Sequence, residues 1–116
     1  MQINLDNKNI TVIVTVDGSK EAIQSIVDHA SSGLSIFKKF NGFIGGATHL
    51  NDSGTRVVQY LQWRDEASHS SCMNDPIWSH TQSSKDFMAL VKTGAIEMKV
   101  DIFKVVNVAD SDTEQD

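Results

Sequence analysis

Apolar residues recur at two different spacings, which divide the chain into predicted strands and helices. The run NITVIVTVD (Asn9–Asp17) is β-branched on both faces, which is typical of a central strand covered on each side. A cap at Asp17 or Ser19 then predicts a helix with a single apolar stripe. The stripe consists of Ala22, Ile23, Ile26, Val27, Ala30, Leu34 and Phe37. We expect this helix to end at Asn41–Gly42, since both residues tolerate the left-handed conformation of helix ends.

The middle of the chain reads as a hairpin. FIGGATHL (Phe43–Leu50) predicts a second strand, in which Gly45-Gly46 allow a bulge or a close approach by another group. NDSG (Asn51–Gly54) is a strong turn signal, so the alternating strand Thr55–Trp63 is expected to return antiparallel.

Two helical regions and a last strand are expected after the hairpin. Asp65 is a candidate cap for a helix that Pro76 interrupts, and a further helix covers roughly Ser83–Lys92 and ends at Gly94. A long strand over Ala95–Val108 follows. Its apolar phase shifts from Phe103, which suggests a bulge or a segment buried on both faces.

This order of elements predicts an α+β, ferredoxin-like βαββαβ fold, with a four-stranded antiparallel sheet and helices on one face. The other face would leave Ile13, Val58 and Tyr60 in water, so we expect a second copy to cover it as a homodimer. Residues 1–108 are expected to form a single domain. The segment 109–116 concentrates acidic residues and is expected to be a disordered tail.

Composition excludes several classes of partner. The chain of 116 residues has a net charge of −5, a mean hydropathy of −0.23 and scattered basic residues, so nucleic-acid binding is not expected. No apolar run approaches the roughly 20 residues that cross a bilayer, and the first residues do not resemble a signal peptide. The lone Cys72 fits a reducing compartment, so we expect a cytoplasmic protein without membrane association.

Strand alternation places candidate chemistry on one face of the third strand. Thr55, Val57, Gln59, Leu61 and Trp63 share the face that the helices cover. A buried Gln59 must find hydrogen-bond partners or cost roughly 1–3 kcal/mol. Either it bonds a helix end or a water, or it points with the Trp63 indole N–H into a cavity.

The four histidines differ in what they can reach. His49 lies next to the strand of Gln59, His69 lies about one turn into the following helix, and His80 follows Trp78 in a stretch that would suit a lid. His29 lies beside the apolar stripe of the first helix. Their spacing matches no metal-ligand pattern, so no metal site is expected.

The residues resemble a known family. The segment Gly42–His69 reads GFIGGATHLNDSGTRVVQYLQWRDEASH and is followed by MNDPIW, and together they resemble the antibiotic biosynthesis monooxygenase family. The similarity spans roughly Asn9–Asn107. It implies a small dimeric α/β barrel that oxidises a phenolic, anthrone-type carbon to a quinone, with molecular oxygen as co-substrate and no metal, flavin or other cofactor.

The resemblance also implies a site for a small aromatic substrate. Trp63 and His49 fall on a pocket tryptophan and a pocket histidine of the family, while Gln59 and His69 fall at positions of an asparagine and of a tyrosine implicated in proton transfer. These four are the predicted catalytic residues, with His69 or His49 as the base. The predicted substrate-binding residues are Trp78, His80, Tyr60 and Phe87.

Other functions fit the same fold. A related dimeric barrel could close rings as an aromatic polyketide cyclase, which consumes no oxygen. A haem-degrading oxygenase would need an axial histidine facing Trp63, and no iron-specific pattern is present. A non-catalytic, ligand-binding protein is the remaining alternative.

Overall fold

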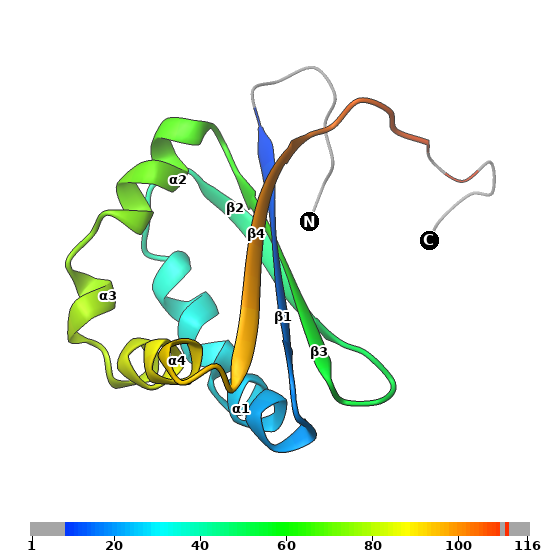
Figure 1. Cartoon of the computed structure of the whole chain (residues 1–116). Helices are drawn as coiled ribbons and strands as arrows, with labels where there is room; N and C mark the ends of the chain where they lie inside the picture. The colour runs from blue at the N-terminus through cyan, green and yellow to red at the C-terminus, as the bar shows by residue number, and fades with distance from the viewer. Residues whose placement is uncertain (1–8, 110, 112–116) are drawn as a thin grey trace.

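The computed structural model of this protein describes residues 9–109 and 111. Within them the bounds of the elements are β1 Ile10–Gly18, α1 Lys20–Phe37, β2 Phe43–Leu50, β3 Arg56–Trp63, α2 Glu66–Met73, α3 Ile77–His80, α4 Gln82–Lys92 and β4 Ile96–Lys104. The strands form one antiparallel sheet in the order β2-β3-β1-β4. The helices lie on one side of that sheet (Figure 1). This is the predicted ferredoxin-like α+β fold.

Local signals in the sequence set most of the boundaries. The Ser19 hydroxyl accepts a hydrogen bond from the Ala22 N–H at 3.2 Å and caps α1, and Asp65 caps α2 by accepting from the Ser68 N–H at 2.8 Å. Gly94 has a φ of 77° and follows α4, as predicted. The predicted bulge in β2 is also present, as a register shift between Phe43 and Gly45.

Two predicted ends are wrong. α1 ends at Phe37, well before Asn41–Gly42, because its last turn tightens: Lys39 and Phe40 donate to carbonyls three residues earlier. β4 ends at Lys104, and from Phe103 it shows neither a bulge nor burial on both faces, since Phe103 is exposed. Lys104 pairs with Ile10, the first residue of β1, so beyond it β1 has no further residue to pair with. The predicted acidic tail lies outside the described residues except for 109 and 111.

The strand registers define two faces of the sheet. On the helix-covered face, cross-strand rows run from β2 to β4. The middle row consists of Thr48, Gln59, Val14 and Val100, and the row beside it consists of Leu50, Val57, Val16 and Met98. On the other face, which we call the open face, Ile13, Val58 and Tyr60 are half-buried. At one end of the open face, Thr11 and Gln62 are cross-strand neighbours and are buried.

The core on the helix-covered face comes in two clusters. The first cluster lies under α2 and consists of Ile10, Val12, Phe37, Leu61, Trp63 and Cys72. The second lies under α1 and α4 and consists of Val16, Ile23, Val57 and Ile96. Val14, in the middle row, packs against both. The two clusters are therefore adjacent at the middle of this face.

The lengths and compositions of the helices in the described region bear on membrane insertion. None of them combines the length and the apolar character that crossing a lipid bilayer requires.

Gly42 and Gly33 give opposite predictions for the same substitution to alanine. Gly42 has a φ of 91°, and an added Cβ would collide with the Ser68 side chain, so Gly42→Ala should destabilise the fold by about 1–3 kcal/mol. Gly33 lies inside α1, where an added Cβ meets nothing within 4 Å. Gly33→Ala should therefore stabilise the protein by about 0.5–1 kcal/mol. Urea unfolding measures both, and a Gly42→Ala protein as stable as the wild type would contradict the assigned backbone conformation.

Candidate active site

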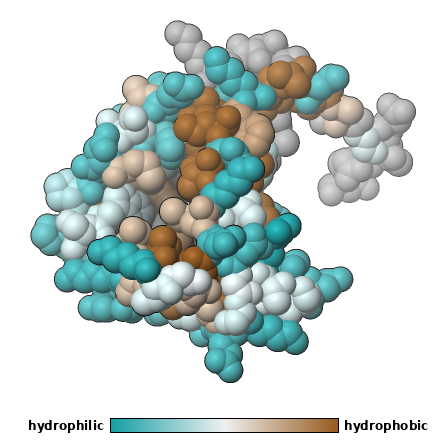
Figure 2. Space-filling view, viewed as in Figure 1, coloured by the Kyte–Doolittle hydropathy of each residue, from teal (hydrophilic) through white to brown (hydrophobic). Residues whose placement is uncertain are grey.

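A cavity of about 380 Å³ lies between the sheet and the helices, where the two core clusters separate. Its floor is formed by β1 and β3 and is mostly aliphatic: Val12, Val14, Val16, Val57 and Leu61. Its walls come from α1, α2, α3 and α4, and its open side lies along β4, where Val100 lines it. Figure 2 shows this hollow between the helices and β4, with hydrophobic side chains at its edge. The cavity is thus a largely apolar slot of a size that suits a small ligand.

Two polar side chains stand together in the cavity wall. Thr48 of β2 and Gln59 of β3 are directly paired across the strands, and both line the cavity. Paired residues on one face of antiparallel strands have their Cβ atoms about 5 Å apart. The Thr48 Oγ1 is buried and has no hydrogen-bond partner among the described residues. The pair therefore places a hydroxyl and an amide in the wall of a largely apolar slot.

His69 lines the same cavity from α2. The Asp65 cap fixes the start of this helix, so His69 lies one turn in and leans over β3. Its imidazole packs against the Trp63 indole, with ring centroids 5.7 Å apart. Burial lowers the pKa of His69 below its ordinary value of 6.5. The ring is therefore neutral at pH 7 and able to accept a proton.

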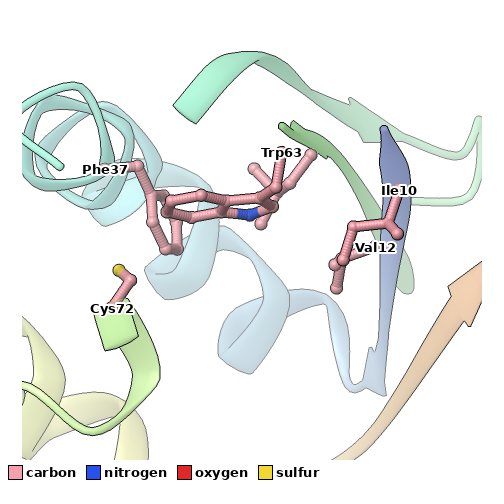
Figure 3. Close-up of a cluster of buried hydrophobic side chains, with 6 residues drawn as sticks. Ile10, Val12, Phe37, Trp63 and Cys72 are labelled. Carbon is pink, nitrogen blue, oxygen red and sulfur yellow. The ribbon is translucent and has the colours of Figure 1, made fainter. Parts of the chain in front are cut away.

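Trp63 does not line the cavity, in contrast to the prediction that its indole N–H and Gln59 point into it together. Its side chain is fully buried, because Phe37 and Phe43 pack on it at 6.0 and 5.1 Å between ring centroids and His69 covers it from α2. Figure 3 shows the indole lying between Phe37 and β1, the strand that carries Ile10 and Val12. The indole nitrogen has no hydrogen-bond partner in the part of the chain that is described. Trp63 is therefore a buried residue on which the His69 ring packs.

Three other predicted site residues lie away from the cavity. His49 pairs with Val58 and Tyr60 pairs with Ala47, so both side chains belong to the open face, opposite to Thr48 and Gln59. His80, at the end of α3, is exposed and does not line the cavity. The structure therefore brings His69 and Gln59 together and separates them from His49, Tyr60 and His80.

The predicted substrate-binding residues Trp78 and Phe87 do line the cavity. Trp78 is the only described cavity-lining residue of α3, and its indole N–H donates to the Cys72 carbonyl at 2.7 Å, which ties α3 to α2. Cys72 itself is buried, and its burial raises the pKa of the thiol to about 11. The thiol therefore stays protonated and is not a nucleophile at neutral pH.

Sequence reasoning missed several lining residues. Thr48 is one, although the turn Asn51–Gly54 fixes the register that places it opposite Gln59. Met73 is another, although it follows His69 by four residues and so shares its face of α2. Ser25 and His29 of α1 and Met88 of α4 carried no local signal, because only the packing of α1 against α4 brings them to the cavity.

Among the described residues, no group of three or more histidine, cysteine or acidic side chains is placed to hold a metal ion. The polar residues that line the cavity are Ser25, His29, Thr48, Gln59, His69, Ser83, Ser84 and Asp86. Imidazole, hydroxyl and amide groups of this kind suit proton transfer and hydrogen bonding to an anion.

No family model matches the chain, and no curated protein is significantly similar to it. Solved structures are similar in fold. A monooxygenase from the gene ActVA-Orf6 of Streptomyces coelicolor, in complex with nanaomycin D, has 20% identity and a TM-score of 0.67, over 89% of this chain and 92% of that one. SnoaB, a cofactor-independent oxygenase from Streptomyces nogalater, has 11% identity and a TM-score of 0.65, over 90% and 99% of the two chains.

A protein of unknown function from Bacteroides thetaiotaomicron, described as a possible oxidoreductase, has 15% identity and a TM-score of 0.66, over 85% of this chain and 99% of that one. At these identities the similarity establishes the shared fold. Two oxygenases and an uncharacterised protein thus share the fold of this chain.

The protonation of His69 gives a direct test of the site. Because burial disfavours the charged ring, His69 should titrate with a pKa below 6.5 when its ring signals are followed by NMR. Below about pH 6.5 the His69 ring is therefore protonated in the unfolded chain but still neutral in the folded chain. The free energy of unfolding falls as the pH drops through this range and levels off below the pKa of the folded state. His69→Gln should reduce this acid-side loss. A titration midpoint at or above 6.5 would contradict the burial of the ring.

Proposed function

We propose that this protein is a cofactor-independent monooxygenase that oxidises a polycyclic phenol or anthrone to a quinone with molecular oxygen. The observation that carries the proposal is the neutral imidazole of His69 in an apolar cavity whose other polar lining includes the Thr48–Gln59 pair. The fold shared with the ActVA-Orf6 monooxygenase and SnoaB adds support.

The chemistry that these residues would perform begins with a proton. His69 accepts a proton from the activated carbon or the hydroxyl of the substrate, and the charge spreads over the aromatic rings to the phenolic oxygen. The Gln59 amide and the Thr48 hydroxyl donate hydrogen bonds to that oxygen. In an apolar cavity such donors are worth more than in water, so they lower the free energy of the anion.

Oxygen then reacts with the anion that the site has stabilised. The carbanion gives an electron to molecular oxygen, and the resulting radical and superoxide combine into a peroxide anion. This anion takes up the proton to become a hydroperoxide, which eliminates water to leave a carbonyl, so a CH₂ group and O₂ become C=O and H₂O. The substrate supplies all the electrons. The protein's part is to bind the flat rings, move the proton and hold the negative charge.

Substitutions in the cavity should separate the roles of these residues. With an anthrone substrate and a metal chelator present, His69→Ala should lower the rate of oxygen uptake by about 10²–10⁴-fold, because the base is lost. Gln59→Leu should lower it by about 10²–10³-fold, as expected for the loss of one donor to the anion. Ser70→Ala, next to His69 but exposed on α2, is the matched control and should retain the wild-type rate.

The same oxygen-electrode assay decides between the bases and between reaction classes. If His49→Ala removes activity and His69→Ala does not, the assignment of the base is wrong. Conversion of the substrate under nitrogen would identify a cyclase instead, and tight binding without any conversion would identify a ligand-binding protein.

We also propose that the protein is a homodimer paired through the open face. This face has half-buried apolar side chains at its centre, Ile13, Val58 and Tyr60, and charges of both signs around them, including the ion pair between Arg56 and Asp17 at 2.5 Å. A surface that carries both positive and negative charges can pair with a copy of itself, because a twofold axis can bring opposite charges of the two copies together.

Sedimentation at several concentrations tests the dimer. The wild type should sediment with twice the mass of the chain, whereas Tyr60→Lys should shift the protein to monomers by placing like charges at the centre of the interface. Lys85→Glu, on the exposed surface of α4, serves as the charge-change control. A wild-type protein that is monomeric at all concentrations would rule out the pairing.

A further inference from the structure

Three methionines surround the mouth of the cavity. Met73 comes from α2, Met88 from α4 and Met98 from β4, and all three line the cavity. They are 44%, 46% and 42% exposed, respectively. They are also all the methionines in the described part of the chain. Methionine is usually a buried residue, so core packing does not account for this arrangement.

The sheet register places these side chains relative to the polar pair. Thr48 and Gln59 lie on β2 and β3, whereas Met98 lies on β4, the opposite edge strand, in the neighbouring row. From β3 to β4 there are two interstrand spacings, or roughly 10 Å. Met98 is thus at the far side of the cavity from the polar pair.

The two helical methionines lie at different distances from the candidate base. Met73 is one helical turn from His69 on the same face of α2. Met88 follows the cavity-lining Phe87 on α4, the helix that packs with α1 over the second core cluster. The mouth therefore has one methionine beside the base and two farther along the slot.

Methionine differs from the rest of the cavity in stiffness. The floor is rich in valine, whose branched side chain has one strongly preferred rotamer in most settings. Methionine is unbranched and polarizable, and it adjusts to aromatic surfaces of different outline. The cavity thus combines a rigid floor, a fixed hydrogen-bonding wall and an adaptable mouth.

We propose that Met73, Met88 and Met98 determine the range of substrates, by adapting to flat aromatic compounds with different numbers of fused rings. The Thr48–Gln59 pair and His69 hold the hydroxyl end in one place, and the additional rings extend towards β4 between the methionine side chains. This inference rests on the proposed function only in that the ligand is a small hydroxylated aromatic compound.

Methyl NMR of the unmodified protein tests the placement of the rings. The protein is labelled with carbon-13 at its methionine methyl groups and titrated with naphthol, anthrol and hydroxypyrene, which have two, three and four rings. Naphthol should shift mainly the Met73 signal, whereas anthrol and hydroxypyrene should also shift the signals of Met88 and Met98. If hydroxypyrene binds and leaves the Met88 and Met98 signals unchanged, the inference is overturned.

Binding constants of a stiffened mouth provide the second test. The wild type should bind the three compounds with affinities within about tenfold of each other, because the mouth adjusts to each. The double variant Met88→Ile/Met98→Ile should bind hydroxypyrene at least about tenfold more weakly than the wild type does and naphthol equally well, because a branched side chain cannot move aside. Leu50→Ile, exposed on β2 and outside the cavity lining, is the matched control.

The outcomes distinguish this inference from the proposed function. If the affinity of the double variant depends on ring number in the same way as that of the wild type, the proposed role of the methionines is overturned, whether or not oxygen is consumed. If affinity depends on ring number as expected but no oxygen is consumed, the proposed monooxygenase activity is refuted and the proposed role of the methionines is not. If the double variant does not fold, the NMR titration of the unmodified protein still decides.

Discussion

The pairing register of β2, β3 and β1 is the constraint on which the candidate site depends. Because side chains alternate between the faces of a strand, a shift of one residue in β2 would exchange Thr48 for His49 beside Gln59. The hairpin turn holds this register: the Asn51 side chain accepts hydrogen bonds from the N–H groups of Thr55 and Arg56, both at 2.9 Å. A few polar contacts in an exposed turn therefore decide which side chains face the cavity.

The same register explains how the fold tolerates a hollow in its core. Each end of the helix-covered face carries a complete cluster, with aromatic rings around Trp63 at one end and aliphatic side chains around Ile23 at the other. The cavity lies over the middle row, which includes Gln59 and Val14, and reaches residues of the rows on either side, such as Val12 and Val16. The clusters supply the burial that stabilises the domain, so the row between them is free to hold polar groups that dense packing would leave unsatisfied.

Much of this arrangement could be predicted from the sequence, because it is encoded locally. Alternation in β3 assigned Gln59 to the covered face, and Asp65 fixed the start of α2 and with it the position of His69. The phase of β2 is not visible in its own pattern, since FIGGATHL does not alternate; only counting back from the turn at Asn51–Gly54 places Thr48 opposite Gln59. His49 was therefore predicted as a site residue on the strand next to that of Gln59, although its side chain faces the other way. The local sequence pattern also did not indicate that aromatic rings from α1 and β2 pack on Trp63 and separate it from the cavity.

The predicted length of β4 was too great for a similar reason. Residues after Lys104 keep the β-branched character of a strand, but a strand requires a partner as well as a propensity. β1 begins at Ile10, and Ile10 is already paired with Lys104, so the ladder ends there. The end of this strand is thus set by its neighbour, ninety residues away in the sequence, and is not visible in the segment itself.

The two kinds of side chain around the cavity imply unequal discrimination. A buried donor that loses its partner remains unsatisfied, and sites built on such donors reject compounds without the matching group by about 10⁴–10⁵-fold. An apolar wall discriminates by only about 10–200-fold for each methylene, and less where the side chains can move. In the proposed binding mode the Thr48–Gln59 wall would therefore be strict about the position of a hydroxyl, whereas the methionine mouth would tolerate different ring systems beyond it. Selectivity would then reside in the sheet, and breadth at the edge of the cavity along β4.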